Sequence, residues 1–165
     1  MRDSDKNNLS LPPEQQAIRD KCFHPSGKFV EFPSEDIETS IPARFEKLVR
    51  TYPERLAVVT QEKAWTYTAL NSVANGIART ILERLGNEAK PIVLLFGKGA
   101  EQIASILAVL KAGKFFVLLD PAFPHAQMRA IFEASLAQGI VTDHENSGLA
   151  MATAKIGRAS CRERV

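Results

Sequence analysis

Residues 110–124 read LKAGKFFVLLDPAFP and contain, in order, the end of a helix, a strand and a turn. Leu110 completes an apolar helical stripe, and Gly113 is of the residue type that most often ends a helix. Residues 115–119 are all apolar without alternation, which is typical of a buried strand covered on both faces of a parallel sheet. Asp120 and the prolines near it predict a turn that leads into another helix. The stretch therefore predicts one helix–strand–helix unit of an α/β fold.

The same alternation of elements extends to both sides of this stretch. In chain order, we expect a helix over 41–52, strands 56–60 and 64–67 joined as a hairpin, a helix over 70–85, a strand over 92–96, a helix over 103–110, the strand 115–119, a helix over 124–136 and a strand over 139–142. This order predicts the α/β class, with a partly parallel sheet, flanking helices and an initial helix plus hairpin.

The regular pattern covers only part of the chain. Residues 1–40 are polar and punctuated by proline, with room for a short helix over 14–22, so we expect a leader or linker. Residues 41–143 carry the α/β pattern, whereas residues 144–155 show no periodicity and stay unassigned. Because the last strand would leave a half-built sheet without cover, we expect the domain to be truncated.

The last ten residues, 156–165, read IGRASCRERV and have neither a hydrophobic period nor a turn pattern. They match one reading frame of a common short-read sequencing adapter, residue by residue. We therefore expect this tail to be adapter-derived and leave it out of the fold prediction. A disordered basic tail is the alternative.

Composition and charge exclude several classes of protein. The net charge of +2 resides in the tail, whose three arginines and one glutamate leave equal numbers of basic and acidic residues in 1–155. No basic stretch is interleaved with aromatic residues, so no nucleic-acid partner is expected. No apolar run is long enough to span a membrane and the first residues are polar, so we expect a cytoplasmic protein. Cys22 and Cys161 make no disulfide framework, and Cys22 with His24 lacks a second ligand pair for a metal.

Two loops at the carboxyl ends of predicted strands are candidate sites, because ligands bind there in open α/β folds. The first, residues 96–102, reads FGKGAEQ, and its Gly97, Lys98 and Gly99 could cradle a phosphate at a helix start. Neither the Walker spacing nor a G-x-G-x-x-G pattern is present, so a plain strand-to-helix turn is the favoured interpretation.

The second loop, in LLDPAFP, is explained by turn formation. Asp120 precedes a proline, and its carboxylate can satisfy amides of the helix that begins at Pro124. Asp120 has no visible partner for base catalysis, since His125 is typical of a solvated helix start. Asp143 and His144 lie where the pattern ends and support no inference. The residues alone therefore predict no catalytic, cofactor-binding or metal-ligating residue.

Two stretches taken together resemble the adenylate-forming (AMP-binding) enzyme superfamily. WTYTALN, residues 65–71, is similar to the L-T-Y-x-E-L motif of adenylation domains of nonribosomal peptide synthetases. LKAGKFFVLLDPAFP resembles their second motif, L-K-A-G-x-x-Y-V-P-L-D-P-x-Y-P, and FEKLVRTYPERLAVV resembles their opening helix and strand. The resemblance covers about 41–142. Ala69, Phe116 and Leu118 stand where the family usually has Glu, Tyr and Pro, and none of these departures removes a reactive group.

The resemblance implies an incomplete N-terminal subdomain in which both motifs are scaffold elements. For the intact parent it implies ATP- and Mg²⁺-dependent activation of a small-molecule carboxylate, with an amino acid favoured. The carboxylate would attack the α-phosphate, pyrophosphate would leave, and the acyl-adenylate would pass to a phosphopantetheine or CoA thiol, typically on a carrier domain. The family's Ser/Thr/Gly-rich loop with its lysine is not in this sequence. The fragment itself is therefore expected to be inactive.

Three alternatives stay open. The parent could be a fatty-acyl or aryl adenylating ligase similar to acyl-CoA synthetases. The chain could instead be a short non-catalytic α/β binding module that uses its strand-end loops, or an untranslated product of sequence assembly. If Met1 is the true start, no condensation domain precedes the resemblance, as expected of an initiating module or a stand-alone ligase.

Overall fold

The computed structural model describes residues 12–14 and 33–154. The chain divides into two compact units, Met1–Glu38 and Thr39–Val165. In the first unit, Ser34–Asp36 form a single 3-10 turn, η1, with no buried residue. The expected helix over 14–22, Cys22, His24 and the tail 156–165 with Cys161 lie outside the described residues, apart from residue 14 itself.

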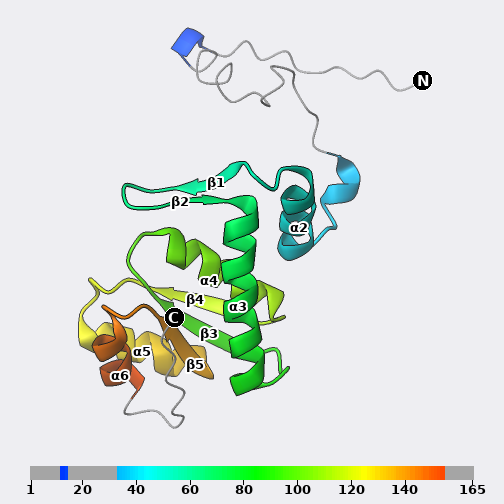
Figure 1. Ribbon diagram of the computed structural model, residues 1–165. Helices are drawn as coiled ribbons and strands as arrows, with labels where there is room; N and C mark the ends of the chain where they lie inside the picture. The colour runs from blue at the N-terminus through cyan, green and yellow to red at the C-terminus, as the bar shows by residue number, and fades with distance from the viewer. Residues whose placement is uncertain (1–11, 15–32, 155–165) are drawn as a thin grey trace. The chain divides into compact units, whose positions relative to one another are not determined.

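The second unit contains the predicted alternation of helices and strands (Figure 1). Its elements are α2 (Ile41–Thr51), β1 (Leu56–Val59), β2 (Ala64–Thr66), α3 (Tyr67–Leu85), β3 (Pro91–Leu95), α4 (Ala100–Lys111), β4 (Phe115–Leu119), α5 (His125–Ser135), β5 (Gly139–Thr142) and α6 (Ser147–Ala154). Helix α2 begins where the sequence predicts, because the side chain of Ser40 accepts a hydrogen bond from the amide of Ala43 at 3.3 Å. The chain reverses before β4 at Gly113, whose φ of 68° suits glycine.

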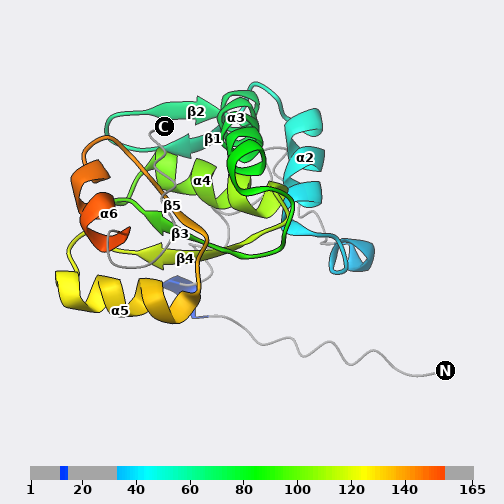
Figure 2. The ribbon, with the colours of Figure 1, turned by 90° about the horizontal axis from the view of Figure 1, so that it is seen from below.

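Three parallel strands form the central sheet in the order β4-β3-β5. Ile92 and Leu94 of β3 pack into the core with α3 and α4, whereas Val93 and Leu95 pack into the core with α5 and α6. The unbroken apolar run of β3 is therefore explained, since consecutive side chains enter two different cores. Figures 1 and 2 show these helices on the two faces of the sheet. The predicted α/β class with a parallel sheet and flanking helices is confirmed.

The predicted hairpin is also confirmed, as a separate two-stranded antiparallel sheet of β1 and β2. Its pairing register shifts between Leu56 and Val58, so the ladder is interrupted within β1. Strand β2 runs directly into α3, where the hydroxyl oxygen of Thr66 accepts a hydrogen bond from the amide of Ala69 at 3.2 Å. Helix α2 packs near this junction, with the rings of Phe45 and Tyr67 centred 6.0 Å apart.

The prediction that β4 is a buried strand is wrong. Only Leu119 is buried in β4, whereas Phe115 and Leu118 are 60% and 44% exposed. The sequence indicated an apolar strand but not the place of that strand in the sheet. Strand β4 lies at the end of the sheet, with β3 as its one strand neighbour among the described residues. Helices cover the two faces of an edge strand less completely than those of a central strand.

The last predicted helix is shorter than its apolar pattern suggested. Helix α5 ends at Ser135, and Leu136 caps it in the left-handed region with φ 53° and 81% of the residue exposed. Leu136 therefore does not belong to the buried face formed by Met128 and Phe132, although its spacing matches that face.

A helix also follows the last strand, where the sequence showed no pattern. Helix α6 packs against α5 and β5 and buries Ala150 and Thr153. Its residues, SGLAMATA, are mostly small and similar on all sides, so no apolar stripe distinguishes a buried face. The expectation that nothing covers this side of the sheet is wrong for the described residues.

Candidate functional site

The carboxyl ends of the three parallel strands meet at one edge of the sheet. Leu95 of β3 is in register with Leu119 of β4 and with Thr142 of β5. The hydroxyl of Thr142, which is buried, donates a hydrogen bond of 2.6 Å to the carbonyl oxygen of Leu95. This bond ties β5 to β3 at the level where the loops emerge. Both candidate loops therefore leave the sheet at the edge where ligands bind in open α/β folds.

The loop after β3 is a strand-to-helix turn that does not require its glycines. Gly99 is the N-cap of α4 in an extended conformation, with φ −176°, and its position offers no side chain to cap the helix. A Cβ added at Gly97 would meet no atom within 4 Å. No other part of the chain comes close enough to position 97 to require a glycine there. Lys98, in the same turn, is exposed to solvent. The geometry is that of the plain turn favoured from the sequence.

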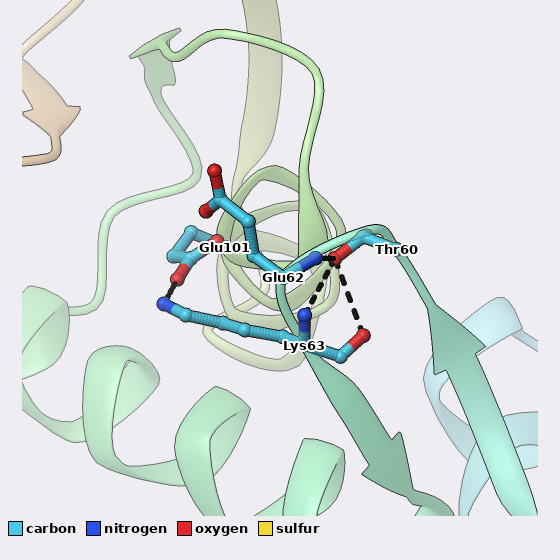
Figure 3. A network of polar contacts seen from close by, with 4 residues as sticks. All are labelled: Thr60, Glu62, Lys63 and Glu101. Atoms are coloured by element: carbon cyan, nitrogen blue, oxygen red, sulfur yellow. Dashed lines mark hydrogen bonds and ion pairs between the residues drawn. The ribbon is translucent and has the colours of Figure 1, made fainter.

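A negative side chain already lies at the amino end of α4 (Figure 3). Glu101, in the first turn, forms an ion pair with Lys63, which reaches it from the turn between β1 and β2. That turn is fixed by Thr60, whose hydroxyl oxygen accepts hydrogen bonds from the amides of Glu62 and Lys63 at 3.3 and 3.0 Å. The amino group of Lys63 also lies 5.8 Å from the centre of the Trp65 ring.

This ion pair changes the titration of both partners. The hydrogen bond from Lys63 holds the pKa of Glu101 below its ordinary value, although partial burial opposes the shift. The same contact raises the pKa of Lys63. A carboxylate also interacts favourably with the positive end of the helix dipole. Glu101 therefore places a negative charge of the chain itself at the positive amino end of α4. Its partner Lys63 lies 38 residues earlier in the chain, so the sequence pattern could not predict the contact.

Asp120 shapes the loop after β4. Its carboxylate accepts a hydrogen bond from the amide of Ala122 at 2.8 Å, and its carbonyl oxygen accepts one from Phe123 at 3.0 Å. The expectation that this carboxylate caps the next helix is wrong, because α5 has Pro124 as its N-cap without a side-chain hydrogen bond. His125 is the first residue of α5 and is exposed.

Asp143 has a similar local role at the end of β5. Its carboxylate accepts hydrogen bonds of 2.8 Å from both the amide and the side-chain nitrogen of Asn146. His144 contributes its carbonyl oxygen, which accepts from the hydroxyl of Ser147 at 2.7 Å. In the part of the chain that the structure describes, the side chains of Asp120 and Asp143 each accept hydrogen bonds from residues of their own loop. The structure brings these loops to one edge without joining them into a catalytic group.

Lys114 is a buried amine that the sequence did not distinguish from a solvated lysine. The residue is 2% exposed, and its amino group donates a hydrogen bond of 2.6 Å to the carbonyl oxygen of Glu88. Burial lowers the pKa of Lys114, while the carboxylate of Glu88 partly opposes the shift. Both residues precede strands, so the contact lies at the amino ends of β3 and β4, away from the candidate loops.

No metal centre or membrane-spanning helix is recognised in the described ranges 12–14 and 33–154. There, no three or more His, Cys, Asp or Glu side chains gather in a way that could hold a metal ion. In the same ranges, no helix combines the length and hydrophobicity that crossing a membrane demands.

Comparison with known proteins extends this description. Residues 45–163 match the family model of the AMP-binding enzymes. Tyrocidine synthase 2 of Brevibacillus parabrevis is 35% identical over 105 residues, which are 64% of this chain and 3% of that protein. The chain therefore spans only a small part of this curated relative.

Solved structures show the same fold. The nonribosomal peptide synthetase FmoA3, in its α-methyl-L-serine-AMP-bound form, matches with a TM-score of 0.64 at 24% identity, over 75% of this chain and 13% of that one. A benzoate CoA ligase from Burkholderia xenovorans matches with a TM-score of 0.65 at 16% identity, over 70% of this chain and 24% of that one. At these identities the likeness supports the fold. Since the family model covers more than half of the residues, this chain belongs to the family of AMP-binding enzymes.

Proposed function

We propose that this chain is part of an ATP-dependent enzyme that activates an amino acid as an acyl-adenylate for nonribosomal peptide synthesis. The observation that carries the proposal is the family match over residues 45–163. Within it, WTYTALN crosses from β2 into α3, and LKAGKFFVLLDPAFP runs from α4 through β4 to the start of α5. The similarity to tyrocidine synthase 2 favours the peptide-synthetase branch of the family.

The proposed reaction has two steps. A carboxylate oxygen of the substrate attacks the α-phosphorus of ATP, a new oxygen–phosphorus bond forms, and pyrophosphate leaves. A phosphopantetheine thiol, held by a carrier domain, then attacks the acyl carbon and AMP leaves. Mg²⁺ would offset the charge on the phosphates. Among the described residues no three or more His, Cys, Asp or Glu side chains gather to hold a metal ion, and we assign no metal ligand to this chain.

The described residues contribute a scaffold to this activity. Asp120 and Asp143 fold their own loops, and the amino end of α4 is neutralised by Glu101. We therefore propose that residues 41–143 form the N-terminal part of the adenylation domain and carry no catalytic residue. The chain of 165 residues should by itself be inactive, since the sequence contains no Ser/Thr/Gly-rich loop with a lysine. We also propose that residues 156–165 derive from a sequencing adapter.

The proposal is tested by ATP–pyrophosphate exchange. One sample is the chain of 165 residues, and the other is the longer enzyme recovered by reading the source DNA through the codon for Ala154. Each is assayed with the twenty amino acids, with benzoate and with a fatty acid. We expect exchange with one or a few amino acids from the longer enzyme, and none above the heat-denatured background from the short chain.

Other outcomes distinguish the alternatives. Exchange with benzoate or the fatty acid alone would overturn the assignment of an amino-acid substrate and favour an acyl or aryl ligase. Exchange by the short chain would overturn its proposed inactivity. Native DNA that encodes residues 156–165 followed by a stop codon would overturn the adapter origin, and nucleotide binding by the short chain would then support a binding module.

A further inference from the structure

Few side chains hold helix α2 to the rest of the second unit. Phe45 is the one buried residue of α2, and Ile41 is 64% exposed. Val49 is partly buried in the core that Phe45 enters, and Figures 1 and 2 show α2 beside α3. Helix α3, by contrast, buries five residues. Because a helix in a protein owes most of its stability to the packing of its apolar face, α2 is the more weakly held of the two.

Lys111, the last residue of α4, contacts α2 through its positive charge. Its amino group forms an ion pair with Glu46 and lies 5.8 Å from the centre of the Phe45 ring. The side chain of Lys111 is 10% exposed and that of Glu46 is 35% exposed. A cation beside an aromatic ring is attracted to it more strongly when water is excluded, and removing one member of a covered ion pair leaves the other charge without a partner. Lys111 therefore holds α2 at two consecutive residues.

The chain just beyond α2 is tied to the start of α3 by bonds that do not involve Lys111. The amide and the hydroxyl of Thr68 both donate hydrogen bonds to the carbonyl oxygen of Pro53, at 3.1 and 2.9 Å. The amide of Tyr67 donates one of 2.9 Å to the carbonyl oxygen of Arg55. Helix α2 thus has one attachment beyond its carboxyl end and a second, separate attachment at the middle of the helix.

We propose that Lys111 is a latch for α2, by which we mean that its contacts with Phe45 and Glu46 hold the helix against α3 and α4. When these contacts break, α2 opens about the turn at Pro53 while the rest of the second unit stays folded. Segments with few buried apolar contacts open in this way at a lower free energy than the whole domain. The stretch WTYTALN supplies the bonds at the turn and LKAGKFFVLLDPAFP supplies the latch, so both stretches act on the same helix.

The first test measures amide hydrogen exchange along the whole chain by mass spectrometry of its peptides. Lys111→Met removes the positive charge and keeps an unbranched apolar side chain, so the α2 amides should exchange roughly tenfold faster. The α3 amides should keep the exchange rates of the wild type. Lys111→Arg, which keeps a cation beside the ring, should restore slow exchange in α2. Lys98→Met, at an exposed lysine in the loop after β3, is the matched control and should leave α2 unchanged.

The second test combines substitutions at both members of the ion pair. Glu46→Gln should also speed exchange in α2, and adding Lys111→Met to it should have a smaller effect than in the wild type, because residues in contact are not additive. Glu83→Gln, at an exposed carboxylate of α3, is the control. Unchanged exchange of α2 in Lys111→Met, or additive effects of the two substitutions, would overturn the latch. Exchange that rises equally in α2 and α3 would show that α2 does not open by itself, and would overturn the proposal as well.

Discussion

The amino group of Lys114 donates a hydrogen bond of 2.6 Å to the carbonyl oxygen of Glu88, and so joins the start of β4 to the connection that leads into β3. The contact is made by a buried cation, because the residue before β4 is covered by the chain around it. Desolvation disfavours the charged form of an amine. The pKa of Lys114 is accordingly lowered, with the like charge of Lys90 adding to the shift.

This lowered pKa predicts how stability depends on pH. Between the folded-state pKa of Lys114 and its unfolded value of about 10.4, the unfolded chain binds more protons, so the free energy of unfolding rises with pH. We expect the free energy of unfolding of wild type minus that of Lys114→Met to increase as the pH rises toward the unfolded pKa of about 10.4, and to level off above it. Urea titrations at several pH values measure this difference. Lys98→Met, a change at an exposed lysine in the loop after β3, is the control and should show no such increase.

Glu101 predicts a pH dependence in the acid range. Its pKa is lowered by Lys63, so the stabilisation is present above the unfolded pKa of about 4.3 and is lost as the pH falls through the lower folded value. Wild type should therefore be more stable than Glu101→Gln at pH 6, and the difference should shrink as the pH falls below the unfolded pKa. Salt should reduce the difference at pH 6, because both side chains are partly exposed. A difference that grows in acid would contradict the ion pair; Glu83→Gln, in α3, is the control.

Leu136 predicts a substitution that stabilises the chain. A left-handed backbone costs a residue with a Cβ atom roughly 1 kcal/mol, and glycine does not carry this cost. Since the side chain is mostly exposed, little packing is lost on its removal. Leu136→Gly should therefore raise the free energy of unfolding by about 1 kcal/mol. Leu136→Ala keeps the strained φ and should change stability little. If Leu136→Gly is destabilising in urea titration, the leucine contributes a contact that outweighs the strain.

Two substitutions of Asp120 should differ in their effect on the free energy of unfolding. Asp120→Ala removes the acceptor for the amide of Ala122 and should lower the free energy of unfolding by about 1 kcal/mol. Asp120→Asn keeps a side-chain oxygen in the same place and should lower it by less, since asparagine forms the same turn. Thermal unfolding of the two variants compares them directly. Equal losses would show that the negative charge, rather than the turn, is what the position needs.

Much of the fold was predictable because its signals are local. Ser40 and the apolar face around Phe45 place α2, and the unbroken run of β3 indicates a strand between two covered faces. Helix α6 was missed because its small residues give no periodic signal, and its burial comes from α5 and β5. The role of Asp120 in a turn was predicted, but the amide that it binds was not.

The sequence by itself determined which segments become helices and strands, since hydrophobic period, capping residues and glycine stops act within a few residues of one another. It also carried the two motifs that place the chain in its family. Tertiary structure alone decided that β4 lies at an edge, that Lys63 reaches Glu101 and that Lys114 is buried. Each of these features depends on strand order or on contacts between residues far apart in the chain. Such contacts form only when the segments pack together, so the pattern of residues within one segment does not reveal them.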